Sequence, residues 1–336
     1  MNQQNPTRSL VIDGLNIGEL TSEQMKRTLE GGIGAINLTS VRPGAGLHDA
    51  LLQIEKARAA VRDMPQYAMI VRTVDDILKA HANGVVGVIL GAQNSLMVEP
   101  DVKLLAAFHS LGMRIMQPTY NERNAFGYGA SYSTTGDRGI TEAGRAWLST
   151  AEELGILVDL SHCGPNTGLD FIAAAKRPLV FSHGNAFALC PSPRNKSDEA
   201  IRAVAGVGGL IGAVTWSPLV RHDRRPTLDD YLDHMEHLIK VGGIEHVGFA
   251  SDLPEILEED PVAWNKTWGH QGIYPNITGV LGEWYAPDTE TTADLQSISQ
   301  VGRVWDGMRK RGYHESDLEK VMSGNWLRIL REIWRD

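Results

Sequence analysis

Short apolar runs alternate with amphipathic, helix-length segments along most of the chain. The apolar runs begin near residues 10, 35, 85, 114, 157, 179, 210 and 246, and each has the length of one buried strand. Because a helix-length segment follows nearly every run, the pattern predicts parallel strand-helix units. Eight such units favour an α/β fold that closes into a (β/α)₈ barrel of the TIM type over an open, doubly wound sheet.

Helical composition, glycine stops and proline breakers delimit the segments between the strands. The predicted helices cover residues 21–30, 48–62, 74–82, 100–111, 141–154, 166–178, 228–241 and 316–334. We expect residues 1–336 to form a single domain. Within it, residues from about 253 onward are predicted to form a C-terminal cap over the barrel mouth, together with a closing helix packed outside the barrel.

Two histidines end consecutive apolar runs in the stretch LVDLSHCGPNTGLDFIAAAKRPLVFSHGNA, residues 157–186. His162 and His183 both follow a serine at the carboxyl end of a predicted strand. In a parallel barrel these ends form the functional face, so the two imidazoles are expected to point into one cavity, as metal ligands do. The alternative is that each histidine only caps its strand with a hydrogen bond.

Composition narrows the class of partner. The 336 residues are 42% hydrophobic, which is enough for a large core, and the net charge of −9 disfavours nucleic acid or an anionic membrane as a partner. The sequence shows neither an apolar N-terminal core of signal-peptide length nor a membrane-spanning run, so we expect a cytoplasmic protein. Cys163 and Cys190 are too few for a disulfide framework, and Cys163 is expected to be a small buried residue.

A connection rich in Gly, Ser and Tyr, NERNAFGYGASYSTTGDRG, follows the fourth main strand. It is too long for a tight turn and is predicted to be an active-site loop, in which Asn124 is a candidate substrate-binding residue.

Several motifs together resemble the renal (membrane) dipeptidase family, whose members are metallopeptidases with an amidohydrolase-type barrel. The motifs are GITEAGRAWLSTAEELGILVDLSHCG, PLVFSHGNA with the following PRN, HVGFASDL, and RGYHESDLEKVMSGNWLRIL. The resemblance extends over nearly the whole chain. It implies a binuclear zinc centre, hydrolysis of dipeptides and a homodimer.

Four positions keep the residues that this resemblance implies. His162 and His183 match two histidine ligands of zinc. Arg194 matches the arginine that binds the substrate carboxylate, and Asp252 matches the aspartate that takes the proton of the nucleophile or meets the substrate amine. From the residues alone, an ordinary surface arginine in the loop PSPRNKSDE is the preferred interpretation of Arg194.

Other positions depart from the family pattern. Leu15 and Ile17 replace the two ligands of the first metal, Gln93 replaces the bridging glutamate, and Tyr120 replaces a histidine that helps polarise the carbonyl. Aliphatic side chains cannot bind a metal, and a neutral amide lacks the charge that two adjacent cations require. The chain is therefore predicted to hold at most one zinc ion, on His162 and His183 with Gln93 or Asp252 as a weaker third donor. Tyr120 either donates a hydrogen bond to a developing oxyanion or only fills space.

Two functions remain open from the sequence. The first is a dipeptidase-like, metal-dependent hydrolase of an amide or related bond in a small, carboxylate-bearing substrate. The second is a non-hydrolytic descendant, either an enzyme of another type such as a lyase or isomerase, or a silent binding protein, which uses the same pocket without metal.

Overall fold

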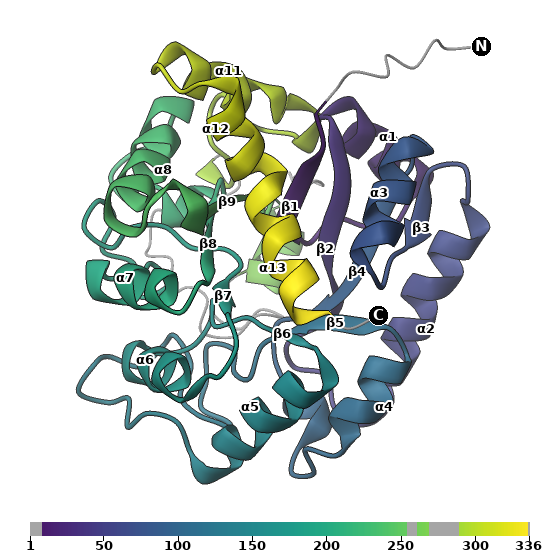
Figure 1. Ribbon diagram of the computed structural model, residues 1–336, viewed down its shortest axis with the longest axis vertical. Helices are drawn as coiled ribbons and strands as arrows, with labels where there is room; N and C mark the ends of the chain where they lie inside the picture. Colours follow the sequence, from purple (N-terminus) through teal and green to yellow (C-terminus); the bar gives the residue numbers. More distant parts are fainter. Residues whose placement is uncertain (1–8, 254–260, 269–288, 335–336) are drawn as a thin grey trace.

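The computed structural model describes residues 9–253, 261–268 and 289–334 of the chain. All eight main strands predicted from the apolar runs are present and parallel (Figure 1). They are β1 (Val11–Asn16), β2 (Ile33–Val41), β4 (Val86–Ala92), β5 (Met113–Met116), β6 (Leu157–Val158), β7 (Val180–Phe181), β8 (Leu210–Val214) and β9 (Val247–Ala250). A short additional strand, β3 (Ala68–Ile70), pairs with the start of β4.

The strands form two sheets that meet along two seams. One sheet has the order β1-β2-β4-β5-β6 and the other β7-β8-β9. At the first seam, the backbone N–H of Leu160 donates to the carbonyl oxygen of Val180 at 2.7 Å. At the second, the N–H of Asp252 donates to the carbonyl oxygen of Leu15 at 3.0 Å. These bonds close the predicted barrel.

Helices surround the strands, as the alternating pattern predicts (Figure 1). They are α1 (Ser22–Glu30), α2 (Leu47–Asp63), α3 (Val74–Ala82), α4 (Leu104–Ser110), α5 (Glu142–Leu154), α6 (Pro165–Ala174), α7 (Asp198–Gly206), α8 (Leu228–Gly242), α9 (Pro261–Trp268), α11 (Gly302–Lys310), α12 (Glu315–Glu319) and α13 (Asn325–Ile333). The bounds of α3 equal the predicted ones, and the capping box of Thr73 and Asp76 fixes its start.

The predicted closing helix is broken and lies across the barrel rather than outside its wall. A π-helical turn, Lys320–Gly324, separates α12 from α13. Figure 1 shows α13 crossing in front of the strands. Its Trp326 is fully buried against Leu10 and other residues at the amino ends of the strands, and donates from Nε1 to the carbonyl oxygen of Phe249 at 3.2 Å. The indole fits because Gly14 and Gly248 leave space where side chains would collide with it.

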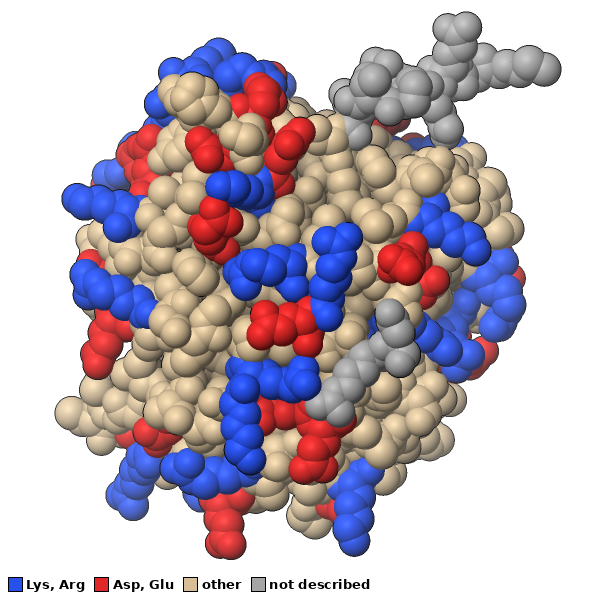
Figure 2. All heavy atoms as spheres, viewed as in Figure 1, with Lys and Arg blue, Asp and Glu red and all other residues tan. Residues whose placement is uncertain are grey.

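The cap predicted over the barrel mouth falls mostly on residues 254–260 and 269–288, which lie outside the described residues. On the face shown in Figure 2, basic and acidic side chains are interspersed. Within the described ranges, none of the helices has both the length and the apolar character that crossing a membrane requires.

Candidate functional site

His162 and His183 meet at the carboxyl ends of β6 and β7. Their Nε2 atoms lie 3.1 Å apart, and their ring centroids are 5.1 Å apart. Both side chains are buried. The structure therefore brings the predicted pair together at one point and does not leave the two rings as separate strand caps.

Oxygen atoms fix both imidazoles through their other ring nitrogen. His162 Nδ1 lies 2.9 Å from Asn121 Oδ1, and His183 Nδ1 lies 2.8 Å from Ser182 Oγ. The Ser182 hydroxyl donates its only proton to a hydrogen bond with Asp159 Oδ2 at 2.5 Å. Its oxygen can therefore only accept a hydrogen bond, from the Nδ1–H of His183. With a proton on each Nδ1, the two Nε2 lone pairs face each other. This is how metal-binding histidines are commonly oriented.

Asp159 organises this part of the barrel. Its carboxylate accepts hydrogen bonds from Gln117 Nε2, from the backbone and hydroxyl of Ser161, and from the backbone and hydroxyl of Ser182. Buried carboxylates need such partners. Asp159 therefore holds together the two strand ends that carry His162 and His183.

The surroundings of the two histidines disfavour a positive charge on the rings. Burial lowers the pKa of both imidazoles well below the ordinary value, and the Arg194 guanidinium lowers it further. Both rings are therefore neutral near pH 7, which is the form that binds a metal ion or accepts a proton.

Tyr120 stacks on His162. The two ring centroids are 3.9 Å apart and the ring planes differ by 22°. A hollow of about 390 Å³ opens beside Tyr120 and Asn121 and reaches Arg42 at its rim. Tyr120 thus lies at the edge of the histidine pair, where the sequence placed a catalytic or space-filling residue.

Asn124 holds the loop that was predicted to bind substrate. Its Nδ2 donates to Asn94 Oδ1 at 3.0 Å and to the carbonyl oxygen of Pro118 at 2.6 Å, while its Oδ1 accepts from the N–H of Phe126 at 2.8 Å. These bonds engage both ends of the amide within the protein. A role of Asn124 in substrate binding stays a prediction that none of these contacts supports.

Arg194 is buried and not on the surface, which excludes the reading of an ordinary loop residue. Its Nη1 donates to the carbonyl oxygen of Ser161. Its Nη2 has no hydrogen-bond partner among the described residues. A buried guanidinium donor without a partner is costly, and a carboxylate would satisfy it.

Asp252 follows β9 in a strained backbone conformation. Its φ of 47° is the only positive value among the described non-glycine residues. Such outliers are often found at functional sites. Burial, with a smaller effect of the Asp13 charge, raises the pKa of Asp252 to about 7 against the opposing effect of the Arg194 charge. A carboxyl with this pKa can both accept and donate a proton near neutral pH.

Among the described residues, the opposite half of the mouth lacks further strong metal ligands. Gln93 donates from Nε2 to Thr39 Oγ1 at 2.9 Å, which leaves its carbonyl oxygen as a neutral donor. Leu15 is buried and Ile17 belongs to an apolar cluster with Val214 and Trp216. In the ranges that the structure covers, no group of three or more His, Cys, Asp or Glu side chains is arranged to hold a metal ion.

Sequence reasoning overlooked three residues of the site. Asn121 and Asp159 orient the histidines, and Lys196 is a buried cation that donates to the carbonyl oxygen of Ser161 at 2.8 Å. The signal for Asp159 was a carboxylate inside the apolar run LVDLSH. The burial of Lys196, in the polar stretch PSPRNKSDE, has no signal in the sequence.

Known proteins are similar to this chain in both sequence and fold. The family model for membrane dipeptidase (Peptidase family M19) matches residues 20–266. An uncharacterised dipeptidase of Schizosaccharomyces pombe is 33% identical over 273 residues, which are 78% of this chain and 63% of that protein. The chain thus spans less than two thirds of the length of this relative.

Solved structures agree with the barrel architecture. An amidohydrolase from Pseudomonas aeruginosa superposes with a TM-score of 0.88 at 29% identity, covering 97% of both chains. A metallopeptidase from Rhodobacter sphaeroides, solved with a phosphinate mimic of the dipeptide L-Ala-D-Ala, gives a TM-score of 0.78 at 22% identity and covers 98% of this chain and all of its own. The resemblance predicted from the strand-end motifs is confirmed: the chain belongs to the membrane dipeptidase family, peptidase family M19.

Proposed function

We propose that the protein hydrolyses an amide or related bond in a small substrate that carries a carboxylate. The observation that carries the proposal is the pair of buried, neutral imidazoles whose Nε2 atoms lie 3.1 Å apart, beside a buried Arg194 with an unsatisfied donor. Membership of a dipeptidase family supports hydrolysis as the reaction class.

The donors among the described residues fit one metal ion and not two. His162 and His183 offer two nitrogen donors with oriented lone pairs, and the Gln93 carbonyl or Asp252 would add a weaker third. Leu15 and Ile17 offer no donor for a second ion. One zinc ion bound to the histidines would supply a Lewis acid that polarises a carbonyl group and acidifies a water molecule.

The protein's own groups bind the substrate and move the proton. Arg194 Nη2 pairs with the substrate carboxylate and fixes its distance from the histidines. Tyr120, stacked on His162, borders the reacting carbonyl. Asp252 takes a proton from the attacking water and returns it to the leaving amine, since its pKa of about 7 suits both steps.

The second candidate is a reaction without metal in the same pocket. One observation favours it, because two cations, Arg194 and Lys196, both act on the pKa of His162 and His183 and would oppose a further positive charge beside them. In that version one imidazole is the general base, and Arg194 still binds the anion.

Elemental analysis and activity together test the proposal. We expect protein purified without chelator to bind about one zinc per chain and to cleave members of a dipeptide library. His183→Ala should abolish both properties, whereas His48→Ala, on the exposed face of α2, should change neither. Absence of bound zinc, together with ligand binding or another reaction in place of amide cleavage, would favour the second candidate and contradict the proposal.

A further inference from the structure

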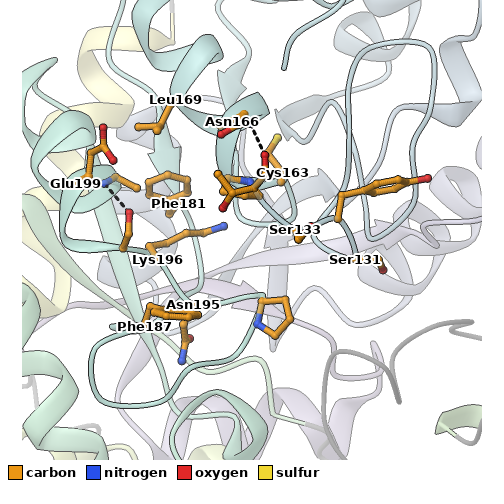
Figure 3. Close-up of a pocket in the computed structure, with 18 of the residues that line it drawn as sticks. Ser131, Ser133, Cys163, Asn166, Leu169, Phe181, Phe187, Asn195, Lys196 and Glu199 are labelled. Atoms are coloured by element: carbon orange, nitrogen blue, oxygen red, sulfur yellow. Dashed lines mark hydrogen bonds between the residues drawn. The ribbon is translucent and has the colours of Figure 1, made fainter. Parts of the chain in front are cut away.

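A second cavity lies between α6 and α7, outside the barrel wall. Its volume is about 510 Å³, within the range of small-molecule sites. Phe181 of β7 lines the cavity and packs in the apolar core between the strands and the helices. The preceding residue, Val180, packs in the apolar core inside the barrel. Because neighbouring residues of a strand point to opposite faces, the cavity lies on the outer face of β7. Figure 3 shows side chains from both helices and from two loops directed at the cavity.

The cavity adjoins the histidine pair but has a different lining. Cys163 and Gly164 line it, whereas none of the residues assigned a role in the proposed hydrolysis does. The two places meet at the carbonyl oxygen of Ser161, which accepts from Lys196 Nζ and from Arg194 Nη1. A molecule in this cavity therefore occupies a place that the proposed hydrolysis does not use.

Lys196 brings a positive charge into the cavity. Its side chain is buried and extends beside Phe181, with Nζ 4.7 Å from the ring centroid (Figure 3). Nζ donates a single described hydrogen bond, to the carbonyl oxygen of Ser161. An ammonium group has three donors, so it can donate further bonds.

The charge of Lys196 has no counter-ion in the described part of the chain. No Asp or Glu there forms an ion pair with it, although other basic residues have such partners. Burial and, to a smaller extent, the neighbouring Arg194 together lower the pKa of Lys196 from 10.5 to about 7. An anion beside Nζ would offset the cost of burying this ammonium group.

The other residues of the cavity wall indicate which chemical groups a ligand would carry besides its anion. Phe181, Leu169 and Pro191 supply apolar surface, and Asn166 and Ser133 supply polar groups. A metal ion is disfavoured beside an ammonium group. We propose that this cavity is a second ligand site, which takes a small carboxylate with an aromatic or branched apolar body and pairs that carboxylate with Lys196.

Binding of 4-fluorobenzoate, followed by fluorine NMR, tests this site. We expect saturable binding to the full chain. Lys196→Met keeps the length of the side chain and removes the charge, so it should weaken binding roughly tenfold or more. The neutral probe 4-fluorobenzamide should bind more weakly by a similar factor. Lys240→Met, an exposed lysine on α8, should leave the affinity unchanged.

Two further variants locate the probe. Ser133→Trp narrows the cavity from an exposed loop position and should also weaken binding, which keeps the test valid should Lys196→Met fail to fold. Arg194→Met removes the carboxylate partner of the proposed active site and should leave the binding of the probe in place. Loss of binding in Arg194→Met with retention in Lys196→Met, or no saturable binding to the unaltered chain, would overturn the proposal.

Discussion

Ser182 connects Asp159 to His183. Its hydroxyl donates to Asp159 Oδ2 at 2.5 Å, and the same oxygen lies 2.8 Å from His183 Nδ1. Because the single hydroxyl proton is engaged by the carboxylate, the imidazole must supply the proton of the second bond. Asp159 thus sets the tautomer of His183 through one serine. In this tautomer the proton is on Nδ1, and the lone pair of Nε2 is directed toward His162.

Replacing Ser182 tests this connection. In Ser182→Ala the Nδ1 proton of His183 loses its acceptor, so the ring orientation is no longer fixed. We expect zinc affinity, measured by titration calorimetry, to fall by about 10- to 100-fold. Ser161→Ala is the control, since it removes one hydroxyl bond to Asp159 and the acceptor of the His183 backbone N–H, and leaves the contact between the Ser182 and His183 side chains. Equal losses in both variants would contradict a specific role of Ser182.

Restoring the missing ligands tests why only one ion fits. The combined variant Leu15→His, Ile17→Asp and Gln93→Glu introduces donors at the three positions where the family pattern is broken. We expect its zinc stoichiometry to rise from about one to about two per chain. The stoichiometry is read by elemental analysis after dialysis. A second ion already bound to the unaltered chain would contradict the prediction.

The pKa of Asp252 predicts a pH dependence of stability. Burial raises this pKa from 3.8 to about 7, so the folded state keeps a proton that the unfolded chain releases. The contribution of this carboxyl to the free energy of unfolding should therefore fall as the pH rises from about 4 to about 7, and should level off above pH 7. Denaturant titrations across this range measure the slope.

The matching variants assign that slope to a residue. The difference between the unaltered chain and Asp252→Asn should give the contribution of Asp252, which extends up to about pH 7. Asp13→Asn should remove only the part below about pH 6, because burial raises the pKa of Asp13 to about 6. An unchanged slope between pH 6 and 7 in Asp252→Asn would show that its carboxyl does not hold the proton.

Arg194 is expected to recognise the substrate carboxylate. Arg194→Gln should raise the KM for a cleaved dipeptide by roughly tenfold or more, because a charge-assisted bond to the carboxylate is lost. The C-terminal amide of the same dipeptide has no carboxylate, so its KM should change little. Steady-state kinetics on both compounds separate the two effects, and a similar rise for the amide would indicate a structural role.

Trp326 is expected to be a main contributor to stability. Trp326→Ala would leave a cavity at the amino end of the barrel and should lower the free energy of unfolding by about 3–5 kcal/mol. Trp305→Ala is a matched control, because this side chain on α11 is only half-buried and its indole bonds to Glu315 at the surface. Chemical denaturation measures both, and similar losses would contradict the role assigned to Trp326.

The pattern of apolar runs was sufficient to predict the barrel. Each strand needs only a short buried run, and each helix needs an amphipathic segment with local caps, so both signals lie in neighbouring residues. The start of α3 at Val74 follows from Thr73 and Asp76 alone. The convergence of His162 and His183 also follows from the sequence, because equivalent positions at the ends of adjacent parallel strands share one face.

Other features depend on contacts between distant residues, which only the tertiary structure decides. The sequence gives no sign that Lys196 is buried, because its burial comes from the packing of a loop against the barrel wall. Trp326 enters the barrel end because Gly14 and Gly248, far away in the chain, leave room for its ring. By itself, the sequence determined the strands, the helices and the two imidazoles, whereas long-range packing decided which charged groups lie beside those imidazoles.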